Sequence, residues 1–214
     1  MVNERIRFFN LYNSHSFLLI KPVNSKRNSI VLEKEKTILG IDPGSNVMGY
    51  GVIKVVGTKA QIVTLGVVKT SGFGDHYQKL RHIFERTLYL VDAFQPDEAA
   101  LEAPFYGKNV QSMLKLGRAQ GVAMAAALFR GVPIFEYAPL KIKQAITGSG
   151  SASKEQVAYF LKQMFNMDIR PKELDATDGL AAAVCHYLQG KNPAKGKSDN
   201  SWEEFIRKNP DRIK

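Results

Sequence analysis

A short apolar run that ends in an acid constrains this chain more than any other stretch. Residues 38–44 read Ile-Leu-Gly-Ile-Asp-Pro-Gly. The run has the length of a strand buried on both faces, and Pro-Gly forces the chain to turn directly after it. Asp42 would then stand at the exposed C-terminal tip of a rigid strand, where it can bind a cation. The alternative is an acid that only opens an Asp-Pro-Gly turn.

Size and charge limit the classes of protein to consider. The chain has 214 residues, of which 44% are hydrophobic, and this is enough for one domain with tails. A formal net charge of +10 indicates a polyanionic partner, either nucleic acid or an anionic membrane surface. No apolar run approaches the roughly 20 residues that span a bilayer, which argues against an integral membrane protein.

Cysteine and histidine usage argues against a disulfide framework and a zinc site. The single cysteine, Cys185, lies in an apolar helical stretch and is predicted to be a core residue. One thiol forms no disulfide framework, so a reducing cytoplasm suits the chain best. The four histidines show no ligand spacing with one another or with Cys185: His15, His76, His82 and His186.

From residue 37 the pattern of apolar residues becomes regular. It predicts strands over 37–42, 47–56, 60–70, 98–102 and 132–137. It predicts helices over 77–94, 110–130, 139–146, 153–165 and 173–188. Short turns make the first three strands an antiparallel meander, and alternating helices and strands then add two parallel strands. The fold class is therefore α/β, a mixed five-stranded sheet with helices on both faces.

The two ends of the chain fall outside this pattern. Residues 1–36 show no clean period and no secretory signal. We interpret them as a disordered or peripheral N-terminal extension or as translation from a start codon placed too early, with a functional arm as a further alternative. Residues 37–190 form the predicted domain. Residues 191–214 are predicted to be a basic C-terminal tail, in which Trp202 and Phe205 suggest a docking helix.

The helix over 110–130 is apolar or small on nearly every side. A helix of this kind is covered all round. Gly117 and Gly121 lie one turn apart and would let another backbone approach closely. Two interpretations stay open: burial within the same chain, or contact with a second subunit. Gly49 and Gly51, inside the second strand, similarly indicate a bulge or a close approach of backbone.

Three further acids stand at the edges of predicted elements. Glu102 ends the fourth strand, which can lie beside the strand that ends in Asp42. Asp175 and Asp178 are three residues apart on the first turn of the last helix and therefore point the same way. A helix N-terminus keeps carboxylates ionised. Four carboxylates without a His or Cys partner indicate a hard cation, Mg²⁺ or Mn²⁺.

These residues resemble the RuvC family, bacterial Holliday-junction resolvases of the ribonuclease-H-like superfamily. The resemblance runs from Ile38 to about Leu188 in order and spacing. It rests on residues 40–44, Leu101-Glu102 with Phe105 and Lys108-Asn109, Lys143-Gln144, residues 148–154, and residues 175–181. The N-terminal extension and the tail depart from the family pattern, and neither includes a site residue.

The resemblance implies a metal-dependent endonuclease of recombination and DNA repair that makes paired nicks in four-way junctions. The four acids named above would be catalytic and would bind two metal ions per site. Lys143 and Lys154 would contact DNA phosphates, Phe105 would stack on an unpaired base, and Lys108 would also contact DNA. Solvated lysines and a core aromatic are the alternatives for these residues. The resemblance further implies a homodimer and a RuvA-RuvB branch-migration complex as partners.

Two other functions compete with this one. The actin-like ATPases and sugar kinases also open with an Asp-x-Gly turn on a related fold, but those chains are usually longer and carry a second such domain. A non-catalytic junction-binding protein would tolerate loss of the acids. All four acids are present in this chain, which favours the enzyme.

Overall fold

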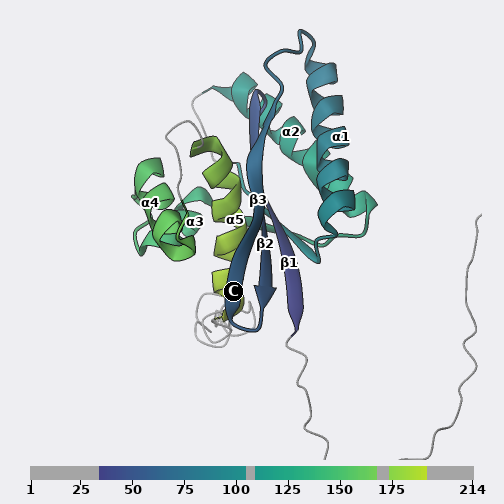
Figure 1. The fold of residues 1–214 in the computed structure, drawn as a ribbon. Coiled ribbons are helices and arrows are strands. Elements are labelled where there is room, and N and C mark those ends of the chain that lie inside the picture. The colour runs from purple at the N-terminus through teal and green to yellow at the C-terminus, as the bar shows by residue number, and fades with distance from the viewer. Residues whose placement is uncertain (1–33, 105–108, 168–173, 192–214) are drawn as a thin grey trace, which may run out of the picture. The chain divides into compact units, whose positions relative to one another are not determined.

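The strands form one mixed sheet in the order β3-β2-β1-β4-β5 (Figure 1). The computed structural model describes residues 34–104, 109–167 and 174–191. The strands are β1 (Glu35–Asp42), β2 (Val47–Val56), β3 (Lys59–Lys69), β4 (Glu98–Glu102) and β5 (Ile134–Tyr137). The first three pair antiparallel, and β4 is parallel to both β1 and β5. The predicted meander with two added parallel strands is therefore confirmed.

Helices cover both faces of this sheet, as predicted. They are α1 (His76–Phe94), α2 (Val110–Phe129), α3 (Pro139–Thr147), α4 (Lys154–Phe165) and α5 (Leu174–Lys191). Helices α1 and α2 lie on one face, and α3, α4 and α5 lie on the other (Figure 1). Within the described ranges, no helix has the length and apolar character needed to cross a membrane.

Local signals set several helix ends where the sequence placed them. The Asn109 side chain accepts a hydrogen bond from the Ser112 N–H and is the N-cap of α2. Ser153 and Gln156 exchange side-chain and backbone hydrogen bonds in a capping box at the start of α4. These caps satisfy backbone N–H groups that have no partner inside a helix.

Some element boundaries differ from the prediction. β1 begins at Glu35, so the predicted boundary after residue 36 falls inside the strand. β5 begins at Ile134 and not at Val132, because the Val132 N–H bonds to the Ala127 carbonyl and Pro133 has no N–H. Helix α5 extends to Lys191, three residues beyond the prediction. Residues 1–33 and 192–214 lie outside the described residues, so their interpretation as an extension and a tail stays a prediction.

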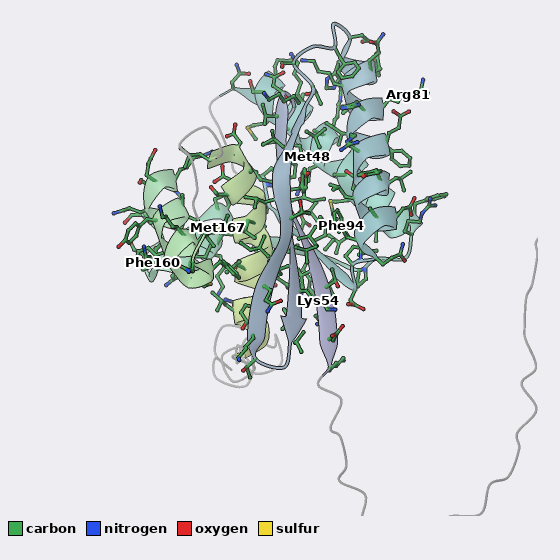
Figure 2. The ribbon with its side chains drawn as sticks, viewed as in Figure 1. Met48, Lys54, Arg81, Phe94, Phe160 and Met167 are labelled. Carbon is green, nitrogen blue, oxygen red and sulfur yellow. The ribbon has the colours of Figure 1, made fainter. Side chains whose placement is uncertain are left out.

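Alternate residues of β1 supply two hydrophobic cores, one on each face of the sheet. Leu39 and Ile41 pack with Met48 in the layer under α1 and α2 (Figure 2). Ile38 packs on the opposite face with the residues of α5, among them Cys185. Cys185 is fully buried, which confirms it as a core residue. The period of two along a strand directs successive side chains to opposite faces, so a central strand can serve both cores.

The backbone of α5 lies directly on a floor of glycines in β1 and β2. A Cβ atom at Gly40 would overlap the Gly179 carbonyl oxygen, and one at Gly49 would overlap that of Asp175. A Cβ atom at Gly51 would come within 2.5 Å of the Leu180 Cα. The predicted close approach at Gly49 and Gly51 is confirmed, and the bulge between β2 and β3 lies one residue further on, at Val52/Ile53.

This contact predicts opposite effects for two glycines of the same helix. A Cβ atom at Gly179 would lie 2.5 Å from the Tyr50 backbone, whereas a Cβ atom at Gly190 would meet no atom of the described residues within 4 Å. We expect Gly179→Ala to lower the free energy of unfolding by about 1–3 kcal/mol through overpacking. Gly190→Ala should leave it unchanged or raise it by up to about 1 kcal/mol, because alanine favours helix. Urea unfolding of both variants measures this difference, and equal stability of the two variants would contradict it.

Candidate active site

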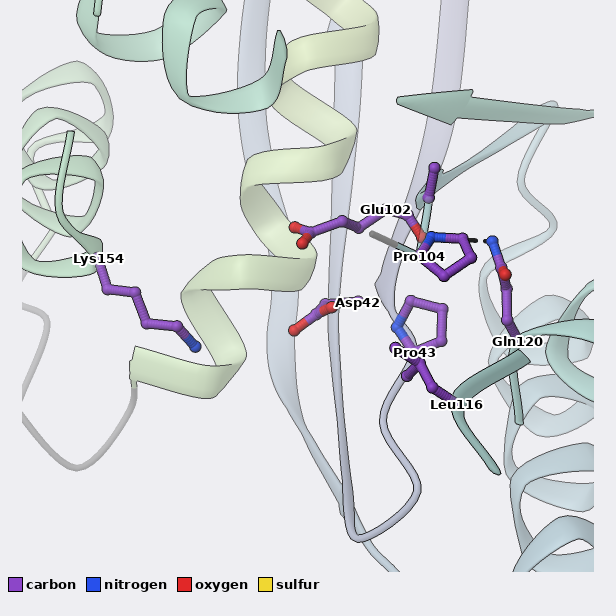
Figure 3. Close-up of a pocket in the computed structure, with 8 residues that line it drawn as sticks. Asp42, Pro43, Glu102, Pro104, Leu116, Gln120 and Lys154 are labelled. Carbon is purple, nitrogen blue, oxygen red and sulfur yellow. Dashed lines mark hydrogen bonds between the residues drawn. The ribbon is translucent and has the colours of Figure 1, made fainter. Parts of the chain in front are cut away.

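Two of the predicted acids end neighbouring parallel strands. Asp42 is the last residue of β1 and Glu102 is the last residue of β4. The register pairs Ile41 with Leu101, so the two acids come next to each other at the carboxyl edge of the sheet. Figure 3 shows both carboxylates pointing the same way, into the space between the sheet edge and Lys154.

The other two acids reach the same edge through α5. Asp175 and Asp178 lie on the first turn of this helix. The close approach of the Asp175 backbone to Gly49, which pairs with Asp42 in the sheet, brings this turn to the end of β1. The structure therefore gathers all four acids from three elements. Asp178 is 13% exposed at its side chain, whereas Asp175 is 58% exposed and faces solvent.

Lys154, the first residue of α4, places a positive charge against this cluster. Its Nζ lies 2.5 Å from an Asp178 carboxylate oxygen and 3.8 Å from one of Asp175. The Lys154 side chain is itself 54% exposed, so this pair is partly screened by water. One ammonium group offsets one carboxylate, and a cluster of four acids retains an excess of negative charge.

Two cavities border the acids and share Asp42, Glu102 and Lys154. The first, of about 220 Å³, extends toward α2 and is lined there by Leu116 and Gln120. The second, of about 200 Å³, extends between α3, α4 and α5. Its lining includes Asp178, Lys143, Lys154, Ile142 and Val157. The predicted phosphate-binding lysines Lys143 and Lys154 therefore lie beside the acids.

Burial and mutual repulsion make these carboxyl groups hard to ionise. Burial, followed by the nearby Asp178 carboxylate, raises the pKa of Asp42 from 3.8 to about 7, although Lys154 opposes the shift. Burial, followed by Asp42 and Asp178, raises the pKa of Glu102 from 4.5 to about 7. Burial also raises the pKa of Asp178, against the hydrogen bond from Lys154. A site of this kind favours a bound cation, which stabilises the charged forms.

The donor set fits a hard divalent cation. Carboxylate oxygens are the ligands that Mg²⁺ and Mn²⁺ prefer. Within the described ranges, no three His, Cys, Asp or Glu side chains converge closely enough to hold a metal ion as they stand. The Lys154 ammonium group contacts Asp178, so a cation bound there would compete with it. Asp42, Glu102 and Asp178 are the side chains that could close around an ion, with Asp175 at the solvent edge.

Sequence reasoning missed Gln120, a buried polar residue of α2. Its amide donates to the Glu102 carbonyl oxygen at 3.4 Å and to a Glu136 carboxylate oxygen at 2.7 Å. It therefore ties α2 to the end of β4, beside the carboxyl group of Glu102. A glutamine on the otherwise apolar face of a helix was the available signal. Phe105 and Lys108 lie outside the described residues, so their contacts with DNA stay predictions.

A family model described as "Crossover junction endodeoxyribonuclease RuvC" matches residues 38–186. This chain belongs to the RuvC family. Membership assigns it the endodeoxyribonuclease activity of that family, as the resemblance implied, and the family is one of metal-dependent nucleases. The match spans every element that carries a predicted acid, from β1 to α5.

Relatives named as RuvC crossover junction endodeoxyribonucleases match most of the chain. One from Bacteroides fragilis is 61% identical over 183 residues, which are 85% of this chain and 97% of the relative. Another from Christiangramia forsetii is 58% identical over 184 residues, covering 86% of this chain and 96% of the relative.

A solved structure of Thermus thermophilus RuvC in complex with a Holliday junction substrate has the same fold. Its TM-score is 0.66 at 33% identity, over 73% of this chain and 95% of that one. The yeast mitochondrial Holliday junction resolvase Ydc2 has a TM-score of 0.52 at 13% identity, over 72% of this chain and 80% of that one, and shows the fold alone. The predicted ribonuclease-H-like class is confirmed by the RuvC match.

The raised pKa values predict how stability depends on pH without divalent cations. A carboxyl group with a higher pKa in the folded chain binds protons preferentially when folded, so stability falls as pH rises through the window from the unfolded to the folded value. That window runs from 3.8 to about 7 for Asp42 and from 4.5 to about 7 for Glu102. We expect thermal unfolding in EDTA to occur several degrees lower at pH 8 than at pH 5.

Two isosteric variants isolate the part of the pH dependence that comes from this cluster. Asp42→Asn removes one raised carboxyl group and should flatten the pH dependence. Asp92→Asn changes an exposed acid of α1 that pairs with Arg130. This variant should preserve the pH dependence. A loss of about 2 kcal/mol would lower Tm by roughly 4–8 °C for a domain of this size. The same pH dependence in both variants would contradict the assignment.

Proposed function

We propose that this chain resolves four-way DNA junctions by hydrolysing phosphodiesters in two opposed strands at the cluster of Asp42, Glu102, Asp175 and Asp178. The observation that carries the proposal is the convergence of Asp42, Glu102 and Asp178 on a cavity that Lys143 and Lys154 also line, with Asp175 at its solvent edge, in a member of the RuvC family. The Thermus thermophilus relative has been solved in complex with a Holliday junction substrate, which supports the same substrate for this chain.

The acids would hold two Mg²⁺ ions per site, with Mn²⁺ also supporting activity. Bound divalent ions supply an activated water and charge stabilisation for the leaving oxygen. Asp42 and Glu102, on rigid strand ends, would hold the ions at the sheet edge, and the ions would position the scissile phosphate. Asp175 and Asp178 approach from α5 on a separate element. The four carboxylates repel a phosphate until cations offset their charge, so DNA would be placed for cleavage only in the loaded site.

Lys143 and Lys154, which line the same cavity as the acids, would contact DNA phosphates. Lys154 pairs with Asp178 in the structure, and a cation at the acids would leave its ammonium group available to a phosphate. Phe105 would stack on an unpaired base at the crossover, a contact worth about 1–3 kcal/mol, and Lys108 would add a phosphate contact. We place this activity in the cytoplasm, where a reducing environment suits the single thiol.

The active species would be a symmetric homodimer. Helix α2 buries one side, with Ala119, Gln120, Ala123, Ala126 and Ala127. The other side is exposed, and the added Cβ of Gly117 or Gly121 meets no described atom within 4 Å. Packing among the described residues therefore covers one side of α2 and leaves the other open. The exposed stripe, which we call the α2 stripe, runs at helical spacing along Val110, Leu114, Gly117, Gly121 and Leu128.

A second copy of the chain is the occupant that this stripe fits best. A two-fold axis places the same apolar patch on both subunits, and two small residues one turn apart let the helices approach closely. Two matched sites then face two equivalent strands of a four-way junction, which has approximate two-fold symmetry itself. Delivery of the junction by a RuvA-RuvB branch-migration complex completes the set of partners that the resemblance implies.

Replacing one metal-binding acid tests the catalytic assignment. We expect Asp42→Asn to reduce nicking of a labelled four-way junction in Mg²⁺ by at least about 100-fold, because the change removes a ligand charge and keeps the shape. Junction binding should survive or improve, since one repulsive charge is lost. Asp92→Asn is the matched control and should cleave as the unmodified chain does. Full activity in Asp42→Asn would reject the site.

A large side chain on the α2 stripe tests the dimer. We expect Gly117→Phe to weaken self-association roughly 5- to 150-fold, which corresponds to an overpacking cost of about 1–3 kcal/mol. Gly72→Phe is the control, because Gly72 is also open to solvent but lies outside α2. Sedimentation measures the association, and a plasmid-borne junction measures coupled nicking of both strands. A monomer that still makes coupled nicks would contradict the proposal.

A further inference from the structure

A third cavity lies beside the loop that joins β1 to β2. It has a volume of about 290 Å³. Its polar lining comes from that loop and from the starts of α1 and α2: Ser45, Asn46, His76, Lys79, Ser112 and Lys115. We call it the Lys79–Lys115 pocket. None of the roles assigned so far to the acids, to Lys143 or to Lys154 uses any of these residues.

The pocket is rich in hydrogen-bond donors, and none of the described residues that line it is an acid. Lys79 donates from Nζ to the Asn46 side-chain oxygen at 2.9 Å. Lys115 is exposed and has no hydrogen-bond or ion-pair partner in the described part of the chain, whereas Lys36, Lys54 and Lys154 each pair with an acid. Two ammonium groups in one cavity repel each other unless an anion lies between them.

His76 adds an unsatisfied polar atom to this wall. Its Nε2 is buried and has no hydrogen-bond partner among the described residues. An unpaired buried donor or acceptor is unfavourable, so a rotation of the ring that brings Nε2 to an anion in the pocket would be favoured. His76 is the first residue of α1, and Ser112 lies in the first turn of α2. The amino ends of two long helices therefore border the pocket, and their dipoles favour an anion. Asp75, the N-cap of α1, contributes a neighbouring negative charge that opposes this effect.

The pocket and the acid cluster lie at the same end of the sheet. Asn46 is four residues after Asp42, and four residues of extended chain span at most about 14 Å. At about 3.4 Å of helix rise per nucleotide on one strand, this distance is about four nucleotide steps. Consecutive residues of α2 face the two sites, because Leu116 lines the cavity at Asp42 and Lys115 lines this one.

We infer that the Lys79–Lys115 pocket binds a backbone phosphate of the DNA, a few nucleotides from the phosphate that is cleaved. The inference rests on the proposed function and adds a contact that it does not include. The described residues of the lining offer ammonium, imidazole, hydroxyl and amide groups, which suit a phosphodiester, and none of them is a Phe, Tyr or Trp on which a base could stack. A phosphate held here would fix the register of the strand across the acids, since phosphate contacts position DNA and base contacts specify it.

Salt dependence of junction binding tests this site. The measurement uses a fluorescent four-way junction and the Asp42→Asn chain as a background that binds without cleaving. We expect Lys115→Ala and Lys79→Ala each to weaken binding and to reduce the slope of log affinity against log salt by about 1. Lys59→Ala is the matched control, because Lys59 is an exposed lysine at the opposite end of the sheet, paired with Val56. Thermal unfolding checks that each variant is folded.

Neutral phosphates then locate the contact. The measurement uses a set of junctions in which one phosphate at a time is replaced by an uncharged methylphosphonate. At one position, within about four nucleotides of the cleavage site, the lost charge should weaken binding to the Asp42→Asn chain. That penalty should disappear when Lys115→Ala is added to the same background, because a coupled pair is not additive. Lys59→Ala added in its place should retain the penalty in full. A penalty that is coupled to Lys115 and not to Lys59 supports the inference.

The possible failures are distinguishable. If the unmodified chain neither binds nor cleaves the junction, the proposed function fails and the inference fails with it. If the unmodified chain cleaves, but the Lys115→Ala and Lys59→Ala backgrounds bind alike, only the inference is overturned. Inorganic phosphate alone is the remaining probe: if it shifts the His76 resonances while no methylphosphonate couples to Lys115, the pocket takes free anions and the DNA contact is rejected.

Discussion

The contact between the α5 backbone and the glycines of β1 and β2 is the constraint on which the site depends. Gly40, Gly49 and Gly51 leave no side chain between the helix and the strands, and Gly179 does the same from the helix. The helix therefore lies closer to the sheet than any side chain would allow. Its first turn reaches the end of β1, which brings Asp175 and Asp178 to the sheet edge where Asp42 and Glu102 end their strands. A single added methyl group on this floor would move the acids apart.

This closeness creates an electrostatic conflict that the chain alone resolves only in part. Burial and mutual repulsion raise the pKa of Asp42 and Glu102 to about 7. Lys154 pairs with Asp178, and its one positive charge leaves the rest of the cluster unbalanced. Stability of the empty fold and readiness to bind a cation therefore oppose each other. The same repulsion that destabilises the acids supplies the affinity for divalent ions.

Helix α2 connects three surfaces that the proposals use separately. Leu116 and Gln120 border the acids, and Ser112 and Lys115 border the Lys79–Lys115 pocket. The α2 stripe, on its exposed side, is the proposed contact with a second subunit. A shift of this helix would move the Glu102 end of β4 through the hydrogen bond from Gln120. Dimer formation, strand register and placement of an acid would thus share one rigid element.

The sequence by itself determined the strands, the helices and the place of each acid along the chain. Apolar periodicity and short turns are local properties, so the meander, the capping box at Ser153 and the acids at the ends of β1 and β4 could be predicted from neighbouring residues. Only the tertiary structure decided which side chains meet. The ion pair of Lys154 with Asp178, the gathering of Lys79 and Lys115 in one pocket, and the exposed side of α2 depend on how segments far apart in the chain pack. No local pattern contains that information, because each of these contacts depends on how separate helices pack on the sheet.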